Sequence, residues 1–204
     1  MTNQDLVNYL ISRNFLKSDR IIEAFRKIDR KDFVLEKYQA DAYNDHPLPI
    51  NHHQTISQPS VVAFMLEKLN PRKGQKILDL GSGSGWTIAL LSNLVSNKGE
   101  VVGVEKIPEL VKFGQKNLAK YNFKNAKIVQ AKSGIFGYPE KASYDKILVS
   151  AAAKEIPKNL VKQLKLNGKM LIPIKSSVIE ITKQKSGKIK KNEYFGFSFV
   201  PLVQ

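Results

Sequence analysis

The segment Lys76-Ile-Leu-Asp-Leu-Gly-Ser-Gly-Ser-Gly-Trp86 decides the fold of this 204-residue chain. Its apolar part, Lys76–Leu80, predicts a short buried strand, and the apolar run Trp86–Val95 predicts a helix. Between them lie Gly81, Gly83 and Gly85, which let the backbone turn sharply and pass close to a ligand. A strand, a glycine loop and a helix in this order indicate a nucleotide-type cofactor site.

Strands and helices alternate along the chain after this loop. Further strands and helices are expected at 100–105, 109–121, 126–130, 144–150, 157–164 and 169–174. This alternation predicts an α/β fold with a mostly parallel, doubly wound sheet.

Both ends of the chain add elements to this sheet. Apolar residues at helical spacing predict N-terminal helices in the first 40 residues, and Pro59 suits the first turn of another helix. Segments 178–184 and 195–200 predict an antiparallel C-terminal hairpin. We expect one domain over 1–204, with three parts: N-terminal helices and a substrate loop at 1–58, a cofactor-binding core at 74–174, and C-terminal strands at 175–204.

Two carboxylates favour S-adenosylmethionine over a dinucleotide as the cofactor. Glu105 ends the second strand, where a carboxylate can accept both ribose hydroxyls. Asp79, just before the loop, suits the ammonium group of an amino acid and would repel a pyrophosphate. The glycines also run G-x-G-x-G rather than G-x-G-x-x-G. The alternative is that they only form a turn and that Glu105 caps the next helix. The pattern resembles the first motif of the Rossmann-like class I S-adenosylmethionine-dependent methyltransferases.

Composition limits the partners and the chemistry. The net charge of +15 comes from lysines scattered along the chain, densest at 183–191 around Ser186-Gly187, where we expect a hairpin turn. We therefore expect a solvated basic surface and no nucleic-acid partner. No apolar run is long enough to span a membrane and no export signal is visible, so we expect a cytoplasmic protein.

Several methyl-transfer chemistries can be tested against the residues. Methylation of base amino groups usually comes with an Asn/Asp-Pro-Pro-aromatic motif, where this chain has Ser150-Ala-Ala-Ala-Lys-Glu-Ile-Pro157. Ring-carbon methylation through a thiolate is excluded because the chain has no cysteine. Catechol-type methylation needs metal-binding carboxylates, and no acidic cluster accompanies Asp145. A carboxylate substrate remains, because it is ionised at neutral pH and needs mainly alignment.

The segment Gln54-Thr-Ile-Ser-Gln-Pro59 supplies small hydrogen-bond donors of the kind that can align a carboxylate. With this segment the chain resembles the protein-L-isoaspartate O-methyltransferases along nearly its whole length. The other matching segments are Arg20–Val34, Tyr43-Asn-Asp, Leu48-Pro-Ile, Ile77–Gly85, Glu105-Lys-Ile-Pro-Glu-Leu, Ser150–Pro157 and Phe199-Val-Pro-Leu.

The resemblance implies methylation of the α-carboxylate of L-isoaspartyl residues in damaged proteins, which starts their repair through a succinimide. It assigns the active-site role to Ser57, which we expect to orient the substrate carboxylate, although Ser57 can also cap the helix at Pro59. We expect the substrate to contact Gln54, Thr55, Ile56, Asn51 and His53. We expect the cofactor to contact Asp79, Gly81, Ser82, Gly83, Gly85, Glu105, Lys106, Ser133 and Gly134.

The chain departs from the family pattern at two places. Asn51 and His53 replace the glycines usual before Gln54, and Lys132-Ser-Gly134 replaces the usual Gly-Asp-Gly. The His52-His53 pair lacks further ligands at suitable spacing, so no metal is expected. We expect a monomer that acts on isoaspartyl proteins and peptides. A methyltransferase for another peptide carboxylate, a basic RNA-binding protein or RNA methyltransferase, and a cofactor-binding pseudoenzyme stay open.

Overall fold

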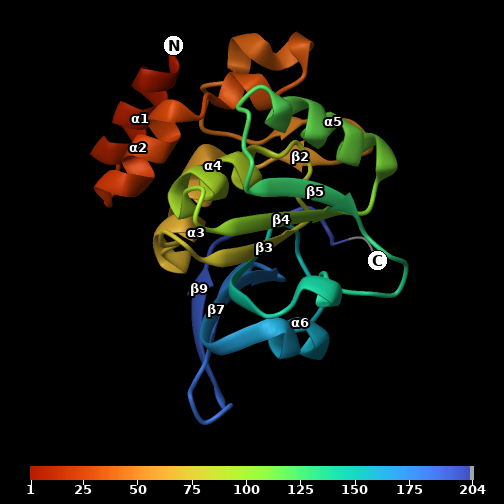
Figure 1. Cartoon of the computed structure of the whole chain (residues 1–204). Helices are drawn as coiled ribbons and strands as arrows, with labels where there is room; N and C mark the ends of the chain where they lie inside the picture. The colour runs from red at the N-terminus through yellow and green to blue at the C-terminus, as the bar shows by residue number, and fades with distance from the viewer. Residues whose placement is uncertain (203–204) are drawn as a thin grey trace.

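A seven-stranded sheet forms the centre of the computed structural model, which describes residues 1–202 (Figure 1). The strand order is β5-β4-β3-β6-β7-β8-β9. The first five strands in this order are parallel, and β8 and β9 are antiparallel. The expected sheet, with an antiparallel C-terminal hairpin, is confirmed. The bounds are β3 Lys76–Leu80, β4 Glu100–Glu105, β5 Ala126–Gln130, β6 Tyr144–Val149, β7 Leu164–Ile174, β8 Ser177–Lys183 and β9 Ile189–Phe195.

Helices cover both faces of the sheet. Figure 1 shows α4 and α5 on one side of the sheet and α6 on the other. The α-helices are α1 Asn3–Ser12, α2 Asp19–Lys27, α3 Pro59–Leu69, α4 Trp86–Val95, α5 Pro108–Ala119 and α6 Lys158–Gln163. Three 3-10 helices, η1 Arg30–Phe33, η2 Glu36–Asp41 and η3 Pro139–Lys141, and a small sheet of β1 Leu48–Pro49 and β2 Thr55–Ile56 complete the fold.

Strand residues alternate between two apolar cores, because successive side chains in a strand point to opposite faces. Ile77 of β3 and Val101 of β4 belong to the larger core, with residues of α1 to α5. Their neighbours Leu78 and Val102 belong to the second core, with Leu160 of α6. The parallel strands are therefore buried on both faces, which explains why they appear in the sequence as continuous apolar runs.

The last strand lies earlier in the chain than predicted. A turn in which Gln184 N donates to Lys188 O at 2.8 Å, with Gly187 at φ +81°, joins β8 directly to β9. The turn at Ser186-Gly187 is confirmed, but the prediction of a strand at 195–200 was wrong. Almost every residue of β9 is exposed, so no apolar alternation marked it. The apolar residues beyond it instead run back to the sheet, where Ala152 N donates to Val200 O at 2.8 Å.

Among residues 1–202, the structure contains no helix with the length and apolar character required to cross a membrane.

Candidate functional site

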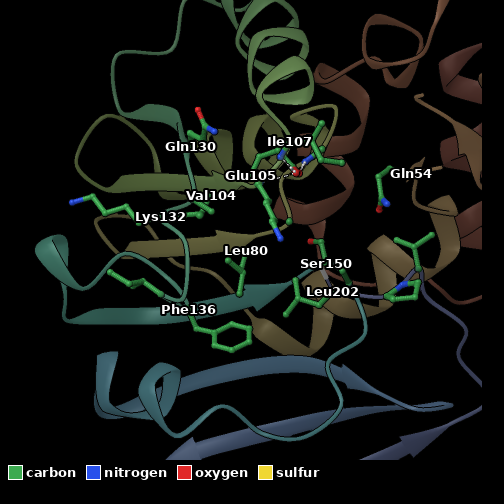
Figure 2. Close-up of a pocket in the computed structure, with 18 of the residues that line it drawn as sticks. Gln54, Leu80, Val104, Glu105, Ile107, Gln130, Lys132, Phe136, Ser150 and Leu202 are labelled. Carbon is green, nitrogen blue, oxygen red and sulfur yellow. Dashed lines mark hydrogen bonds between the residues drawn. The ribbon is translucent and has the colours of Figure 1, made fainter. Parts of the chain in front are cut away.

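A cavity of about 360 Å³ opens at the carboxyl ends of β3, β4, β5 and β6 (Figure 2). Ligands of open α/β sheets bind at this end of the strands. Figure 2 shows Gln54 on one side of the cavity and Lys132 on the other, with Glu105 and Ser150 between them. The predicted residues that line it are Gln54, Thr55, Gly81, Gly83, Glu105, Lys106, Ser133 and Gly134.

The glycine loop needs glycine at all three positions. Gly81, Gly83 and Gly85 have φ of +83°, +47° and +86°, a region that other residues rarely adopt. The role of Gly85 differs from that of the other two, because it does not line the cavity. A Cβ atom on Gly85 would lie 3.0 Å from the carbonyl oxygen of Gly114 in α5. Gly85 therefore allows the loop and α5 to pack closely, while Gly81 and Gly83 face the cavity.

Glu105 connects the glycine loop to the start of α5. Its Oε2 accepts a hydrogen bond from Gly83 N at 2.9 Å, and its Oε1 accepts from Lys106 N at 2.8 Å and Ile107 N at 3.0 Å. The carboxylate lines the cavity although only 7% of the residue is exposed. The two N–H groups precede α5, whose cap residue Ile107 makes no side-chain capping bond, so Glu105 is not a helix cap; it holds the backbone before α5 and also lines the cavity.

Asp79 lies beneath the cavity and does not line it. The residue is fully buried, and its carboxylate accepts hydrogen bonds from the hydroxyls of Thr87 and Ser150, the latter at 2.8 Å. Burial raises the pKa of Asp79 to about 6, against the lowering effect of these two hydrogen bonds. Asp79 can therefore affect a ligand only indirectly, through the hydrogen-bonded Ser150, which lines the cavity.

A second, smaller cavity of about 30 Å³ lies beside the first and contains the predicted residues Ile56, Ser57 and Ser82 in its lining. The two cavities share four lining residues: Thr55, Gly81, Gly83 and Ser150. Ser57 therefore lies next to the ligand space at the side formed by the glycine loop, rather than inside the larger cavity.

Arg30 fixes the backbone that carries Ser57. The residue is fully buried, and its Nη1 donates to the carbonyls of Ala42 at 2.7 Å and Asn44 at 3.3 Å. Its Nη2 donates to the carbonyls of His46 at 2.9 Å and Ser57 at 3.1 Å. Four backbone oxygens of the segment before α3 thus converge on one guanidinium group.

The same guanidinium lies 5.4 Å from the centre of the Trp86 ring, at the start of α4. Burial lowers the pKa of Arg30 to about 10, opposed by the nearby Asp45 carboxylate, so the group stays charged at neutral pH. One cation therefore links the substrate loop to the helix that follows the glycine loop.

Asp45 caps α3, so the cap proposed for Ser57 was wrong. The cap position is Gln58, whose side chain makes no capping hydrogen bond. The Oδ1 atom of Asp45 instead accepts from Ser60 N at 2.8 Å, which satisfies one of the free N–H groups at the helix start. The hydroxyl of Ser57 is not used for this cap, and the residue lines the smaller cavity.

Asn51 and His53, which stand where the resemblance predicts glycine, and His52 between them have a left-handed backbone. Asn51, His52 and His53 have φ of +78°, +51° and +55° and are exposed. Asn51 and His53 line neither cavity. The loop therefore keeps a path that suits glycine, and the added side chains lie outside the ligand space.

Sequence reasoning missed more than half of the lining. Ser150 follows β6 directly, so the rule that ligands bind at the carboxyl ends of parallel strands was sufficient to find it. Val200 was assigned to a strand, Pro201 and Leu202 were placed only in the C-terminal part of the domain, and none of the three was assigned to the site. The other missed residues are Ile50, Leu80, Val104, Ile107, Gln130, Ala131, Lys132, Ile135, Phe136 and Ala151.

Comparison with known proteins finds one family along the whole chain. Residues 1–204 match the family model described as protein-L-isoaspartate(D-aspartate) O-methyltransferase (PCMT). A protein-L-isoaspartate O-methyltransferase of Methanopyrus kandleri is 42% identical over 202 residues, which is 97% of this chain and 89% of that protein. The protein of the same name from Thermococcus onnurineus is 43% identical over 202 residues, which is 97% of this chain and 91% of that protein.

A solved structure has the same fold at full length. It is a protein-L-isoaspartate O-methyltransferase from Plasmodium falciparum in complex with S-adenosyl-L-homocysteine. Its TM-score to this chain is 0.90 at 30% identity, and the match covers 100% of this chain and 99% of that one.

Proposed function

The chain belongs to the protein-L-isoaspartate(D-aspartate) O-methyltransferase family, and we propose that it methylates the α-carboxylate of L-isoaspartyl residues in damaged proteins. The observation that supports this best is the position of Ser57. Its backbone is held by Arg30 beside the glycine loop, and its hydroxyl is not used as a helix cap.

The larger cavity fits S-adenosylmethionine. Its volume of about 360 Å³ lies within the range of small-ligand sites, about 300–1,000 Å³. Glu105 offers a carboxylate for ribose hydroxyls, Gly81 and Gly83 allow close approach of the backbone, and Ile107 and Phe136 provide apolar surface for a purine. When bound, this cofactor supplies a methyl group on a positively charged sulfur.

The protein needs no strong base for the transfer. A carboxylate has an ordinary pKa of about 4 and is already ionised at neutral pH, so its oxygen is ready to accept a methyl group. The protein has to hold that oxygen in line with the methyl carbon. We assign this orientation to the Ser57 hydroxyl, assisted by Gln54, which lines the larger cavity, and by Thr55, which lines both cavities.

The product of this step is a methyl ester, which closes to a succinimide without further help from the protein. Hydrolysis of that ring returns part of the material to normal aspartate. The contribution of the enzyme to repair is therefore to replace a poor leaving group on the isoaspartyl residue with methanol.

We further propose one domain with divided roles. Residues 1–58 hold the substrate, 74–174 bind the cofactor, and the described part of 175–204, up to residue 202, closes the sheet edge and borders the cavity through Val200, Pro201 and Leu202. We also propose that the protein works as a monomer in the cytoplasm, without a nucleic-acid partner and without a metal.

Matched peptides test the proposal. The protein is incubated with labelled S-adenosylmethionine and two peptides that differ only in an isoaspartyl or an aspartyl residue. We expect label in the isoaspartyl peptide alone. Equal labelling of both peptides would point to a methyltransferase for other carboxylates. Labelling of neither peptide, with cofactor binding intact, would point to a pseudoenzyme. Labelling of neither peptide together with salt-sensitive RNA binding would point to an RNA-binding protein or an RNA methyltransferase.

A further inference from the structure

Asn167 and Gly168 are the only Asn-Gly pair in the sequence, and they lie in a bulge of β7. On one side, β6 pairs Tyr144 with Leu164 and next pairs Lys146 with Lys169, so its register skips residues 165–168. On the other side, the register of β8 with β7 starts at Lys169. The pair therefore lies outside both ladders of the sheet.

The bulge exposes the side chain of Asn167. Lys165, Leu166 and Asn167 are exposed in succession, whereas a paired strand would alternate its faces. Asn167 has φ of +61°, a left-handed conformation. Gly168 itself is buried, but the pair lies outside the hydrogen-bond ladders, and unpaired backbone opens at lower free energy than a paired strand.

We infer that Asn167 converts to an L-isoaspartyl residue as the protein ages, and that this makes the chain a substrate of its own activity. The inference rests on the proposed function. The backbone nitrogen of Gly168 attacks the side-chain carbonyl carbon of Asn167, a C–N bond forms, and ammonia leaves. Because glycine has no Cβ, its nitrogen is the least hindered of any residue. Water then opens the resulting succinimide, and cleavage at the backbone carbonyl gives the isoaspartyl residue with a free α-carboxylate.

The methyl-transfer step at residue 167 is the one proposed above. The α-carboxylate oxygen forms a bond to the methyl carbon, the bond from that carbon to sulfur breaks, and S-adenosylhomocysteine leaves. The nitrogen of Gly168 then displaces methanol from the ester and restores the succinimide. Over repeated cycles of methylation, ring closure and hydrolysis, residue 167 accumulates as normal aspartate, so the net change is Asn167 to Asp.

The position of the bulge requires that a second copy performs the repair. Gly168 lies beside Asp145 at the amino end of β6, since a Cβ on Gly168 would be 3.2 Å from the Asp145 carbonyl oxygen. The cavity begins past the other end of the same strand, at Ser150. At about 3.3 Å per residue, the two ends are on the order of 15 Å apart. The chain cannot place its own residue 167 in its own cavity while the sheet is intact.

Asn14 provides an internal control. It is exposed and has φ of +62°, but Phe15 follows it. Exposure and a left-handed backbone are therefore matched, whereas the next residue is phenylalanine at one site and glycine at the other. Asn167→Ser removes the reactive side chain, and Asn14→Ser is the matched variant. Gly168→Ala is unsuitable, because its Cβ would lie 2.8 Å from the carbonyl oxygen of Lys165.

The experiment ages the purified protein in mildly alkaline buffer and then adds fresh enzyme with labelled S-adenosylmethionine. We expect labelling that rises with age, maps to the peptide containing residue 167, and is lost in Asn167→Ser but kept in Asn14→Ser. Circular dichroism confirms that the aged chain is still folded. To test methyl transfer between molecules, an aged copy that carries an affinity tag is mixed with fresh, untagged enzyme, and the label on the tagged copy is measured.

A synthetic isoaspartyl peptide in the same assay separates the two proposals. If the peptide is not methylated, the proposed function fails. If the peptide is methylated but aged chain is not, or if Asn14 gains as much label as Asn167, the inference about this bulge is overturned and the proposed function stands. Labelling that is independent of enzyme concentration would overturn transfer between copies.

Discussion

Arg30 and Ser57 are joined by a hydrogen bond of 3.1 Å from the guanidinium Nη2 to the serine carbonyl. The bond connects a buried cation to the backbone of the residue that we assign to substrate orientation. Because the same group also holds the carbonyls of Ala42, Asn44 and His46, the segment before α3 is fixed at both of its ends by one side chain.

Arg30→Lys is expected to lower kcat/KM for an isoaspartyl peptide by about tenfold or more, while cofactor affinity changes by less than about twofold. Lysine keeps the charge, but it offers three donors at one point and cannot reproduce the planar fork, so at least one carbonyl loses its partner. A loss of about 1.5–3 kcal/mol for a hydrogen bond to a charged group corresponds to roughly tenfold or more. Peptide kinetics and calorimetry of cofactor binding measure the two quantities.

Arg20→Lys is the matched control for this variant. Arg20 donates to the carbonyl of Pro71 at 2.9 Å and to the side chain of Asn70, at the far end of α3. The Arg20→Lys variant should leave the peptide kinetics unchanged. A parallel fall in cofactor affinity in Arg30→Lys would show a general loss of structure and would refute the positioning role.

Ser57→Ala is expected to reduce kcat by about 10- to 100-fold, because one donor to a charged oxygen contributes about 1.5–3 kcal/mol. Cofactor affinity should be unaffected, since Ser57 lies in the smaller cavity. Ser57→Thr keeps the hydroxyl and should recover part of the rate. Ser60→Ala serves as control, because it retains the backbone N–H that Asp45 accepts. Unchanged turnover in Ser57→Ala would reduce this residue to a structural role.

Glu105→Gln is expected to weaken cofactor binding and to lower the melting temperature together. The carboxylate accepts three backbone N–H groups, and the amide end of glutamine would turn a donor toward some of them. Glu100→Gln, at the opposite end of β4, loses only an ion pair to Lys76 of 3.4 Å and should change neither quantity by much. Calorimetry and thermal unfolding decide it, and normal affinity in Glu105→Gln would contradict the assignment.

Gly85→Ala is expected to destabilise the fold more than Gly134→Ala. Both glycines have a left-handed φ, +86° and +72°, so both variants carry a strain of about 1–2 kcal/mol. Only at Gly85 does the new Cβ meet other atoms: it would lie 3.0 Å from Gly114 O and 3.2 Å from Ile128, whereas at Gly134 nothing lies within 4 Å. Urea unfolding of the two variants gives the difference directly. Equal losses of stability would mean that close packing of the loop on α5 is unimportant.

Asp79→Asn is expected to change how stability depends on pH. The pKa of Asp79 rises from an ordinary 3.8 to about 6 in the folded protein, so the folded state holds the proton more tightly than the unfolded chain. The contribution to stability is fully present below about pH 4 and is lost as pH rises through about 6, a change on the order of 3 kcal/mol. Asparagine cannot titrate, so the stability difference between the two proteins should vary over this window. Parallel curves in urea unfolding would contradict the prediction.

The sequence predicted the parts of the molecule that depend on local pattern. The strand, glycine loop and helix at 76–95 are confirmed, as is the helix that begins at Pro59, because burial on both faces and backbone conformation are visible in residue type. Asp45 was not identified as the cap of α3, since it lies 15 positions before the N–H that it accepts. A contact of this kind depends on how the chain folds back, and no spacing rule reaches it.

Arg30 and the C-terminal residues of the cavity were hidden for a related reason. In the sequence Arg30 is one of 33 basic residues, and only burial distinguishes it from those on the surface. Val200 and Leu202 have the apolar character of strand residues, and they reach the cavity because Ala152 pairs with that segment. Contacts between residues that meet only through the tertiary fold were therefore the weakest part of the prediction.

The choice of main-chain oxygens as the targets of Arg30 has a consequence for how this loop can evolve. Every residue type carries the same carbonyl group, so substitutions along 42–57 can alter side chains without removing a partner of the guanidinium. Asn51 and His53, where the resemblance predicts glycine, follow a left-handed path that is compatible with this freedom. The anchor is thus insensitive to the sequence that it holds, and the rim around the ligand space is free to acquire new preferences for the peptides it accepts.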